Sequence, residues 1–155
     1  MVFNASAIKK SVSFPRISPD GNYIVITLHN YGCFPIWHKE ADLWSIDLKT
    51  MLATQMGLNS DCTDSYHSWS SNSRWLVFSS KRIDGLTARF FISYISGDGT
   101  SAKPFILPQK DPGFYQRYLK SFNLPELSRL KVDIDPGKIR RVAKGSAIQA
   151  KWAEN

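Results

Sequence analysis

The chain has 155 residues, of which 43% are apolar and 13% aromatic, and a formal net charge of +7. This composition excludes a disordered chain, and no apolar run approaches the roughly 20 residues that span a bilayer. The length suits one ordinary domain with a core of its own.

Apolar residues alternate with a period of two through most of the first 109 residues, which predicts strands rather than helices. The predicted strands are YIVI, DLWSIDL, RWLVFSS, RFFISYI and KPFIL, which begin at Tyr23, Asp42, Arg74, Arg89 and Lys103. The turn sequences SPDG, HNYG, SSNS, IDG and GDG separate them. We expect no helix before Asp111.

The same unit occurs twice along this strand region. RISPDGNYIVIT (16–27) aligns with SWSSNSRWLVFS (68–79) at an offset of 52, and LWSID from Leu43 aligns with ISYIS from Ile92 at an offset of 49. The alignment sets Ser18 on Ser70, Asp20 on Asn72, Gly21 on Ser73 and Tyr23 on Trp75. A repeat of about 40 to 50 residues with four short strands is the unit of a β-propeller blade.

We therefore predict an all-β fold for residues 1–110: a partial β-propeller of two four-stranded antiparallel blades, with repeats at about 14–57 and 67–109. Residues 111–155 form a helical or irregular C-terminal extension. An amphipathic helix is predicted around GFYQRYLKSF, where five apolar residues have helical spacing and Pro125 ends the pattern. They are Phe114, Tyr115, Tyr118, Leu119 and Phe122. The polar tail turns at 135–137 and either docks through Trp152 or is loose.

The pattern ISPDGNYIVIT…DLWSIDLKT resembles the WD-repeat-like propeller repeats of TolB-like proteins. The stretch SYHSWSSNSRWLVFSSKRIDGL…KPFILPQKDPGFY resembles the C-terminal blades of TolB-like proteins of Bacteroidetes-type bacteria. Together these stretches extend the resemblance over about residues 3–125. It implies a propeller fold and a periplasmic or cell-envelope location within a longer exported parent, and it implies no particular chemistry.

Two blades are fewer than the four or more that close a propeller ring. Either the chain is a fragment or truncated product of a longer propeller, which we favour, or several copies assemble a ring. The missing neighbours are then further blades of the parent chain or copies of this one. The opening MVFNASAIKK places lysines after a short apolar patch, the reverse of a secretory signal, so we expect no export signal in this chain.

Three loops are predicted to open on one face of the blades: 29–42, 57–67 and 80–86. Binding residues concentrate on loops held by a rigid scaffold, so we nominate this loop face as a binding site. It gathers all three histidines, His29, His38 and His67. The candidate binding residues are Tyr31, Trp37, His38, Glu40, Asp61, Asp64, Lys81 and Arg82.

The loop sequence YGCFPIW, which contains Tyr31, Phe34 and Trp37, has two interpretations. Exposed, it is a patch that binds a partner; folded back, it is a lid over the blade. Cys33 and Cys62 lie on adjacent loops of the same face. They are either a disulfide, in an oxidising compartment, or two separate thiols.

Recognisable catalytic and cofactor signatures are missing from the sequence. There is no G-x-S-x-G nucleophile elbow, and HKE has no partner at metal-ligand spacing, so we predict no metal and no cofactor. GDGTSA (97–102) joins two predicted strands instead of opening a helix, which predicts a hairpin turn rather than a dinucleotide site.

The sequence therefore favours a non-catalytic module that binds a protein or a saccharide through the loop face. The alternative is the substrate-filtering propeller of a hydrolase whose catalytic domain lies outside this chain. From Gly137 onward the tail has five basic residues and one acid. It lacks interleaved aromatics, so nucleic-acid binding is not expected.

Overall fold

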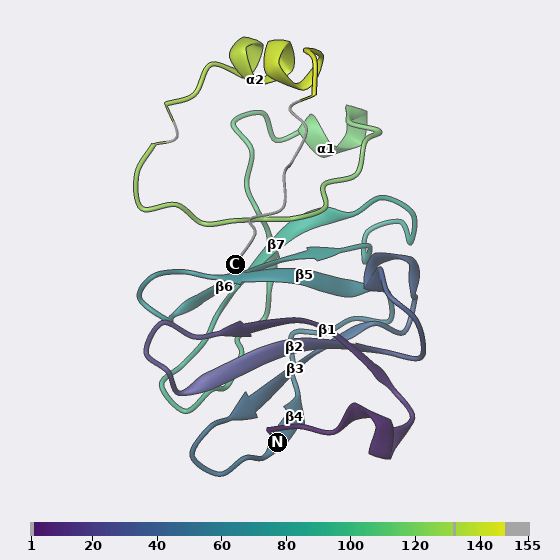
Figure 1. Ribbon diagram of the computed structural model, residues 1–155, viewed down its shortest axis with the longest axis vertical. Helices are drawn as coiled ribbons and strands as arrows, with labels where there is room; N and C mark the ends of the chain where they lie inside the picture. Colours follow the sequence, from purple (N-terminus) through teal and green to yellow (C-terminus); the bar gives the residue numbers. More distant parts are fainter. Residues whose placement is uncertain (1, 132, 148–155) are drawn as a thin grey trace, which may run out of the picture.

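The computed structural model describes residues 2–131 and 133–147. Eight strands and four short helices follow one another along the chain (Figure 1). In chain order they are η1 (Ala5–Ile8), β1 (Ser11–Ile17), β2 (Tyr23–His29), η2 (Pro35–Trp37), β3 (Asp42–Asp47), β4 (Ala53–Gln55), β5 (Asp64–Trp69), β6 (Trp75–Ser80), β7 (Arg89–Tyr94), β8 (Phe105–Ile106), α1 (Phe114–Arg117) and α2 (Pro136–Ala143).

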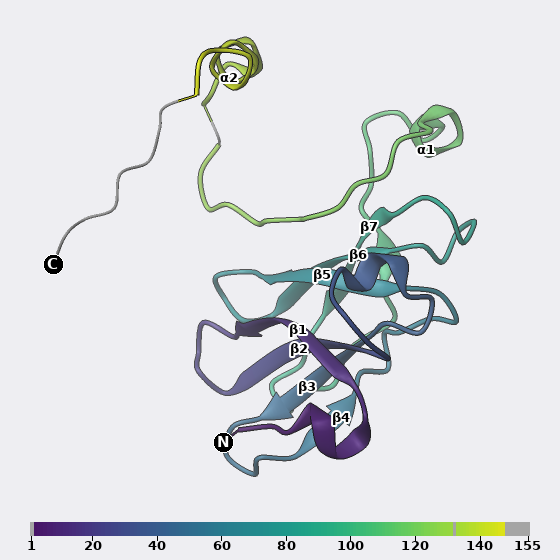
Figure 2. The ribbon, with the colours of Figure 1, turned by 45° about the vertical axis from the view of Figure 1, so that its right-hand side comes forward.

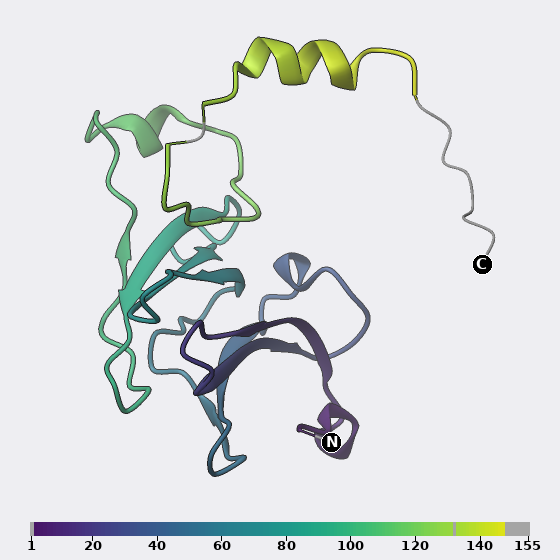
Figure 3. The same cartoon turned by 60° about the vertical axis from the view of Figure 1, so that its left-hand side comes forward.

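The strands form two separate antiparallel sheets of four, in the orders β1-β2-β3-β4 and β5-β6-β7-β8. We call the first sheet blade 1 and the second blade 2. Each is a simple meander, and the two sheets pack face to face (Figure 3). This confirms the predicted all-β class, a partial propeller followed by the short helices α1 and α2. The one-turn helices η1 and η2 lie before Asp111, where no helix was expected. The sheets span 11–55 and 64–106, so each begins about three residues before the predicted repeat.

The turn of blade 1 is built by its Ser-Pro-Asp-Gly sequence. The Ser18 N–H donates to the Tyr23 carbonyl at 2.8 Å, the Tyr23 N–H donates to Ser18 Oγ at 3.0 Å, and Ser18 Oγ donates to Asp20 Oδ1 at 2.7 Å. Gly21 has φ +74°, a left-handed conformation that glycine adopts without steric cost. The serine thus closes the hairpin through its backbone and its side chain.

Blade 2 repeats this turn with other residues. The Ser70 N–H donates to the Trp75 carbonyl at 2.8 Å, the Trp75 N–H donates to Ser70 Oγ at 2.9 Å, and Ser70 Oγ donates to Asn72 Oδ1 at 2.6 Å. Ser73 occupies the left-handed position, with φ +58°. The predicted alignment of the two turns is therefore confirmed, bond for bond.

The first strand of each blade contains a bulge that the sequence analysis did not predict. The ladder register breaks between Ser13 and Arg16 in β1 and between Ser65 and Ser68 in β5. Within the bulges Phe14 has φ +52° and Tyr66 has φ +46°, and their rings meet edge to face at 4.7 Å. The two bulges are 52 residues apart, so the repeat extends to an unusual backbone conformation.

The third strands follow a slightly different alignment from the predicted one. Val25 pairs with Ser45 in blade 1, and its counterpart Val77 pairs with Ile92 in blade 2. Ile92 therefore corresponds to Ser45, two residues from Leu43, on which the sequence alignment had set it. Because side chains alternate with a period of two, the shift leaves every residue on its expected face.

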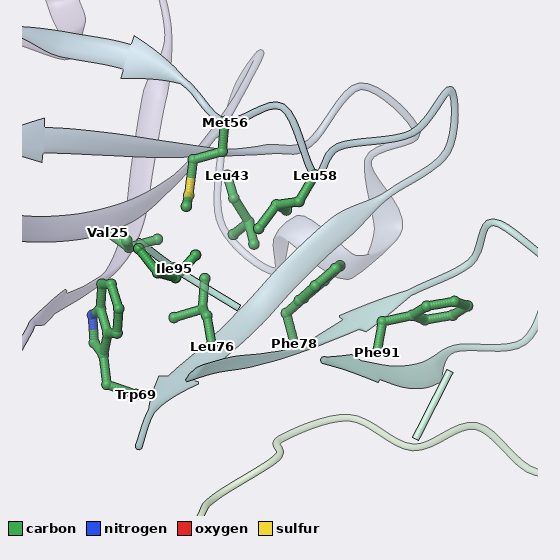
Figure 4. Packing of buried hydrophobic residues seen from close by; sticks show 9 residues of the cluster. All are labelled: Val25, Leu43, Met56, Leu58, Trp69, Leu76, Phe78, Phe91 and Ile95. Carbon is green, nitrogen blue, oxygen red and sulfur yellow. The ribbon is translucent and has the colours of Figure 1, made fainter. Parts of the chain in front are cut away.

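The main core lies between the blades (Figure 4). Blade 1 and the loop after it contribute Val25, Leu43, Met56 and Leu58, and blade 2 and its flank contribute Trp69, Leu76, Phe78, Phe91 and Ile95. Trp69 also donates its indole N–H to the Arg16 carbonyl at 3.1 Å, which joins the two inner strands. The two sheets therefore share one core.

The outer face of blade 1 is covered by the N-terminal segment (Figure 2). Ala5 of η1 packs with Ile26, Leu28 and Ile46 in a second, smaller apolar cluster, against which Phe3 also lies. This segment removes an apolar sheet face from water.

The outer face of blade 2 is partly covered by the segment after β8, whose helix is shorter than predicted. The helical turn α1 ends at Arg117. The buried Arg89 guanidinium donates hydrogen bonds to the Tyr118 carbonyl at 2.5 Å and to the Lys120 carbonyl at 2.6 Å, so these groups do not continue the helix. Phe122 then packs against Phe90 with tilted rings whose centroids are 5.0 Å apart. Leu119, predicted on the apolar face of a helix, is 86% exposed instead.

The helix α2 begins at Pro136, where Asp135 caps it by accepting the Gly137 N–H at 2.9 Å. It lies away from both sheets in every view (Figures 1, 2 and 3). None of the helices in residues 2–131 and 133–147 is long and apolar enough to cross a bilayer. The predicted docking of Trp152 falls outside the described residues.

Candidate functional site

Hydrogen bonds join the three predicted loops into one surface. Thr63 of the inter-blade loop donates its hydroxyl to the His38 carbonyl at 2.8 Å, and the Asp64 N–H donates to the Ala41 carbonyl at 2.8 Å. The Lys81 N–H donates to the Thr63 carbonyl at 3.1 Å. The loop face is therefore formed by residues 30–41, 56–63 and 81–88. The predicted second loop, 57–67, ran too far, because residues 64–67 belong to β5.

The aromatic residues of the first loop face the solvent. Tyr31 is 71% exposed, Phe34 63% and Trp37 79%, whereas Pro35 and Ile36 between them are buried. The two buried residues hold the loop against the protein, and Ile36 packs beside Tyr66. Of the two interpretations of YGCFPIW, the structure supports an exposed patch for its aromatic rings.

Polar neighbours orient the exposed rings. The Lys81 ammonium lies 4.9 Å from the centre of the Trp37 ring, and the Tyr31 ring meets His38 edge to face at 4.7 Å. His38 Nδ1 lies 3.4 Å from Glu40 Oε1. Burial acts to raise the pKa of Glu40, but hydrogen bonds from backbone N–H groups, including that of Asn30, and the nearby His38 lower it overall.

Asp64 and Arg82 form a buried ion pair beneath this surface. Arg82 Nη2 lies 2.7 Å from Asp64 Oδ1 and also donates to the Leu58 carbonyl at 2.9 Å, while Ser60 donates to Asp64 Oδ2 through its N–H and its hydroxyl. Asp64 is fully buried, and the Arg82 guanidinium lies over Phe91. The expectation that Asp64 contacts a partner is therefore corrected: the pair holds the inter-blade loop on blade 2.

Two of the three histidines expected at the surface are buried. His29 accepts or donates at both ring nitrogens, to Ser13 Oγ at 2.9 Å and to the Tyr31 carbonyl at 3.0 Å, and burial lowers its pKa. His67 belongs to β5, not to a loop, and bonds the Val25 carbonyl at 2.9 Å between the blades. Burial lowers the pKa of His67 to about 4. Only His38 remains near the surface.

Asp42 is a residue of this region that sequence reasoning missed. It begins β3 and accepts the Gln55 amide at 2.7 Å. Burial and, after it, the nearby Asp64 charge raise its pKa to about 6. Its position directly after the loop, before an alternating strand, was the available signal.

The remaining predicted residues of the face are Asp61, Cys33 and Cys62. Asp61 is exposed on the inter-blade loop. Cys33 and Cys62 are both free thiols among the described residues, so the disulfide alternative is not formed. Within residues 2–131 and 133–147, no group of three His, Cys, Asp or Glu side chains is placed to hold a metal ion.

No protein-family model matches this chain, and no curated protein matches it. A similar solved structure is the β-propeller domain of the Trilobed protease from Pyrococcus furiosus, described as having an open velcro topology. It is 18% identical, with a TM-score of 0.42, over 64% of this chain and 30% of that one. This chain thus spans less than a third of that structure, and its own ladder registers define its architecture.

Proposed function

We propose that the chain is a non-catalytic interaction module that binds a protein partner through Tyr31, Phe34 and Trp37 on the loop face. The observation that carries this proposal is their exposure of 63 to 79%, on a loop anchored by buried neighbours. Exposed Trp and Tyr side chains dominate the energetics of protein interfaces. Anchoring the loop in advance reduces the entropy lost on binding.

The shape of this surface favours a protein over a saccharide. Small ligands bind in concave pockets that bury most of the ligand. The three rings instead project into solvent, which suits a partner that brings its own pocket. The Lys81 ammonium over Trp37 and the nearby Glu40 then supply a polar rim.

The test is differential capture from a bacterial envelope extract. Immobilised wild-type protein is compared with Trp37→Ala and with Leu119→Ser, a matched change of an exposed apolar residue that belongs to none of the three loops. We expect at least one protein to be retained by wild type and Leu119→Ser and lost about tenfold with Trp37→Ala, as for an interface hot spot. Equal capture by all three would contradict the proposal.

We further propose, on the TolB-like resemblance, that the module works in the cell envelope as part of a larger propeller or with further copies of itself. Two blades do not close a ring. A groove lined by Trp75, Ile92 and Phe105 remains on the outer face of blade 2, where a third blade would pack. Light scattering over a concentration series tests self-association: a constant monomer mass would exclude the assembly of copies.

A further inference from the structure

A second recess lies between the blades at the end opposite the loop face. It has a volume of about 450 Å³ and is enclosed by the β3–β4 turn and the β7–β8 turn, which lie side by side at the bottom of Figure 3. This volume falls in the range of about 300 to 1,000 Å³ that is usual for small-ligand sites. Of the loop-face residues, only Met56 and Gly57, at the start of the inter-blade loop, are among its lining residues, and none of the exposed aromatic, charged or cysteine residues of that face is.

The two turns that form the walls are rigid. Asp47 Oδ1 accepts the N–H groups of Lys49 at 2.7 Å and Thr50 at 3.1 Å. Asp98 Oδ1 accepts the Thr100 N–H at 3.0 Å and the Ser96 hydroxyl. Each aspartate therefore stabilises its own turn with one oxygen, and its second oxygen makes no hydrogen bond among the described residues.

Tyr23 lies between these carboxylates. Its ring packs so closely on Gly99, at φ +83°, that a Cβ there would come within 2.7 Å of the ring. Burial raises the pKa of the Tyr23 hydroxyl, and the charges of Asp47 and Asp98 raise it further. The phenol is thus neutral and held in place at the pocket wall.

The remaining lining is polar and without positive charge. The hydroxyls of Ser45, Thr54 and Ser101 make no hydrogen bond within the described residues, although all three line the pocket. Leu52 and Met56 add an apolar surface. No Lys, Arg or His is among the lining residues, and Arg74, whose charge acts on Tyr23, lies outside the lining, so phosphates, carboxylates and nucleic acid would meet two carboxylates first.

We propose that this pocket binds a neutral saccharide, of one or two sugar units. The second oxygens of Asp47 and Asp98 accept hydrogen bonds from sugar hydroxyls, and such charge-assisted bonds are the strong ones. The serine and threonine hydroxyls donate or accept at the remaining positions. The Tyr23 ring, Leu52 and Met56 contact the apolar C–H face of the sugar.

The test is an amide NMR titration of the ¹⁵N-labelled chain with maltose, cellobiose and N,N′-diacetylchitobiose, each to about 20 mM, which covers millimolar affinities. We expect saturable shifts of Thr54, Gly99 and Thr100 with at least one sugar. Shifts that stay linear, or that map outside the pocket for all three, would overturn the proposal. Putrescine is titrated in parallel, and saturation by putrescine alone would mark a cation site instead.

A matched pair of variants locates the binding. Asp98→Asn keeps Oδ1 for its turn and removes the charged second acceptor, so sugar affinity should fall about tenfold, equivalent to ~1.4 kcal/mol. Asp20→Asn makes the same change at a turn outside the pocket, where blade 2 already uses Asn72, and should leave affinity unchanged. Equal affinity for wild type and Asp98→Asn would contradict the assignment. Trp37→Ala should bind sugar normally, so this test is independent of the proposed protein partner.

Discussion

The two blades differ in sequence at their first turns and agree in structure. Blade 1 uses Pro19, Asp20 and Gly21 where blade 2 uses Ser71, Asn72 and Ser73. Both turns nevertheless form the same set of hydrogen bonds. The comparison shows that this turn requires a small oxygen-bearing side chain and one left-handed residue, and that several residue types supply them.

The loops between the second and third strands diverge instead. That of blade 1 has twelve residues, 30–41, and that of blade 2 has eight, 81–88. The longer loop presents exposed aromatic rings, while the shorter one begins with Lys81 and the Arg82 of the buried ion pair. The repeated parts of the blades therefore provide the scaffold, and the parts that are not repeated provide the candidate site.

The largest expected loss of stability comes from breaking the Asp64–Arg82 ion pair of blade 2, which has no counterpart at the corresponding positions of blade 1, Val12 and Asn30. Asp64→Ala leaves the Arg82 guanidinium without its partner, which should lower the free energy of unfolding by about 3 to 5 kcal/mol. Urea unfolding at pH 7 measures it. Asp61→Ala, an exposed change on the inter-blade loop that precedes Asp64, should stay within about 0.5 kcal/mol of wild type. Similar values for both would show that the pair does not hold the inter-blade loop.

The next effect is a pH dependence from His67 at the blade interface. Burial lowers the pKa of His67 to about 4 in the folded protein, whereas its pKa in the unfolded chain is about 6.5. Stability should therefore fall by about 3 kcal/mol as the pH drops from 6.5 to 4.

His67→Gln keeps an N–H donor for the Val25 carbonyl and removes the titrating group. The free energy of unfolding of this variant should therefore vary less between pH 4 and pH 6.5. Urea unfolding of the two proteins at several pH values measures this. The contribution of Asp42 to the pH dependence is the same in both proteins and cancels in their difference. Its raised pKa makes stability fall as the pH rises from 3.8 to about 6, which is the opposite direction. Parallel curves for the two proteins would exclude His67 as the source.

A smaller effect sharpens the comparison of the two turns. Gly21→Ala meets no atom within 4 Å, so its cost is the left-handed backbone alone, about 1 kcal/mol. Ser73→Gly relaxes the same strain but loses the hydrogen bond that Ser73 Oγ accepts from the Asp20 N–H at 2.9 Å, so a net change within about 0.5 kcal/mol is expected. Thermal unfolding of both variants measures the difference. If Ser73→Gly were as costly as Gly21→Ala, the bond between the turns would outweigh the strain.

The smallest expected effect on stability is that of Trp37→Ala. With 79% of the residue in water, little burial is lost, and the free energy of unfolding should change by at most about 0.5 kcal/mol. A larger loss, measured in the same unfolding assay, would mean that the ring stabilises its loop and would weaken its interpretation as a binding residue.

Local signals in the sequence predicted much of the architecture. Alternation in DLWSIDL and RWLVFSS identified β3 and β6, and the Ser18 turn aligned with Ser70 identified the repeat. The loop face could be predicted from the order of the strands, because that order places the three loops at the same end of the blades. Tyr31, Trp37 and Lys81 do lie on it.

What sequence reasoning missed depends on contacts between distant residues. β5 carries Asp64, Ser65 and His67, so it lacks an apolar pattern and was taken in part as a loop. Asp64 and His67 Nε2 find partners elsewhere in the chain, Arg82 and the Val25 carbonyl, which the local sequence does not reveal. The early end of α1 likewise depends on Arg89, which competes for carbonyl groups some thirty residues away.

The non-repeating peptide over the two outer sheet faces has a consequence for assembly. Because the blades repeat, the flank at one end of the pair is shaped to match the flank at the other. Segment 2–10 and the stretch around Phe122 lie where such a match would form. Proteolytic removal of either segment would expose an apolar sheet face that can pack against the opposite face of another copy. Such a head-to-tail contact closes into a ring or grows into a fibre, depending on the rotation between neighbouring copies.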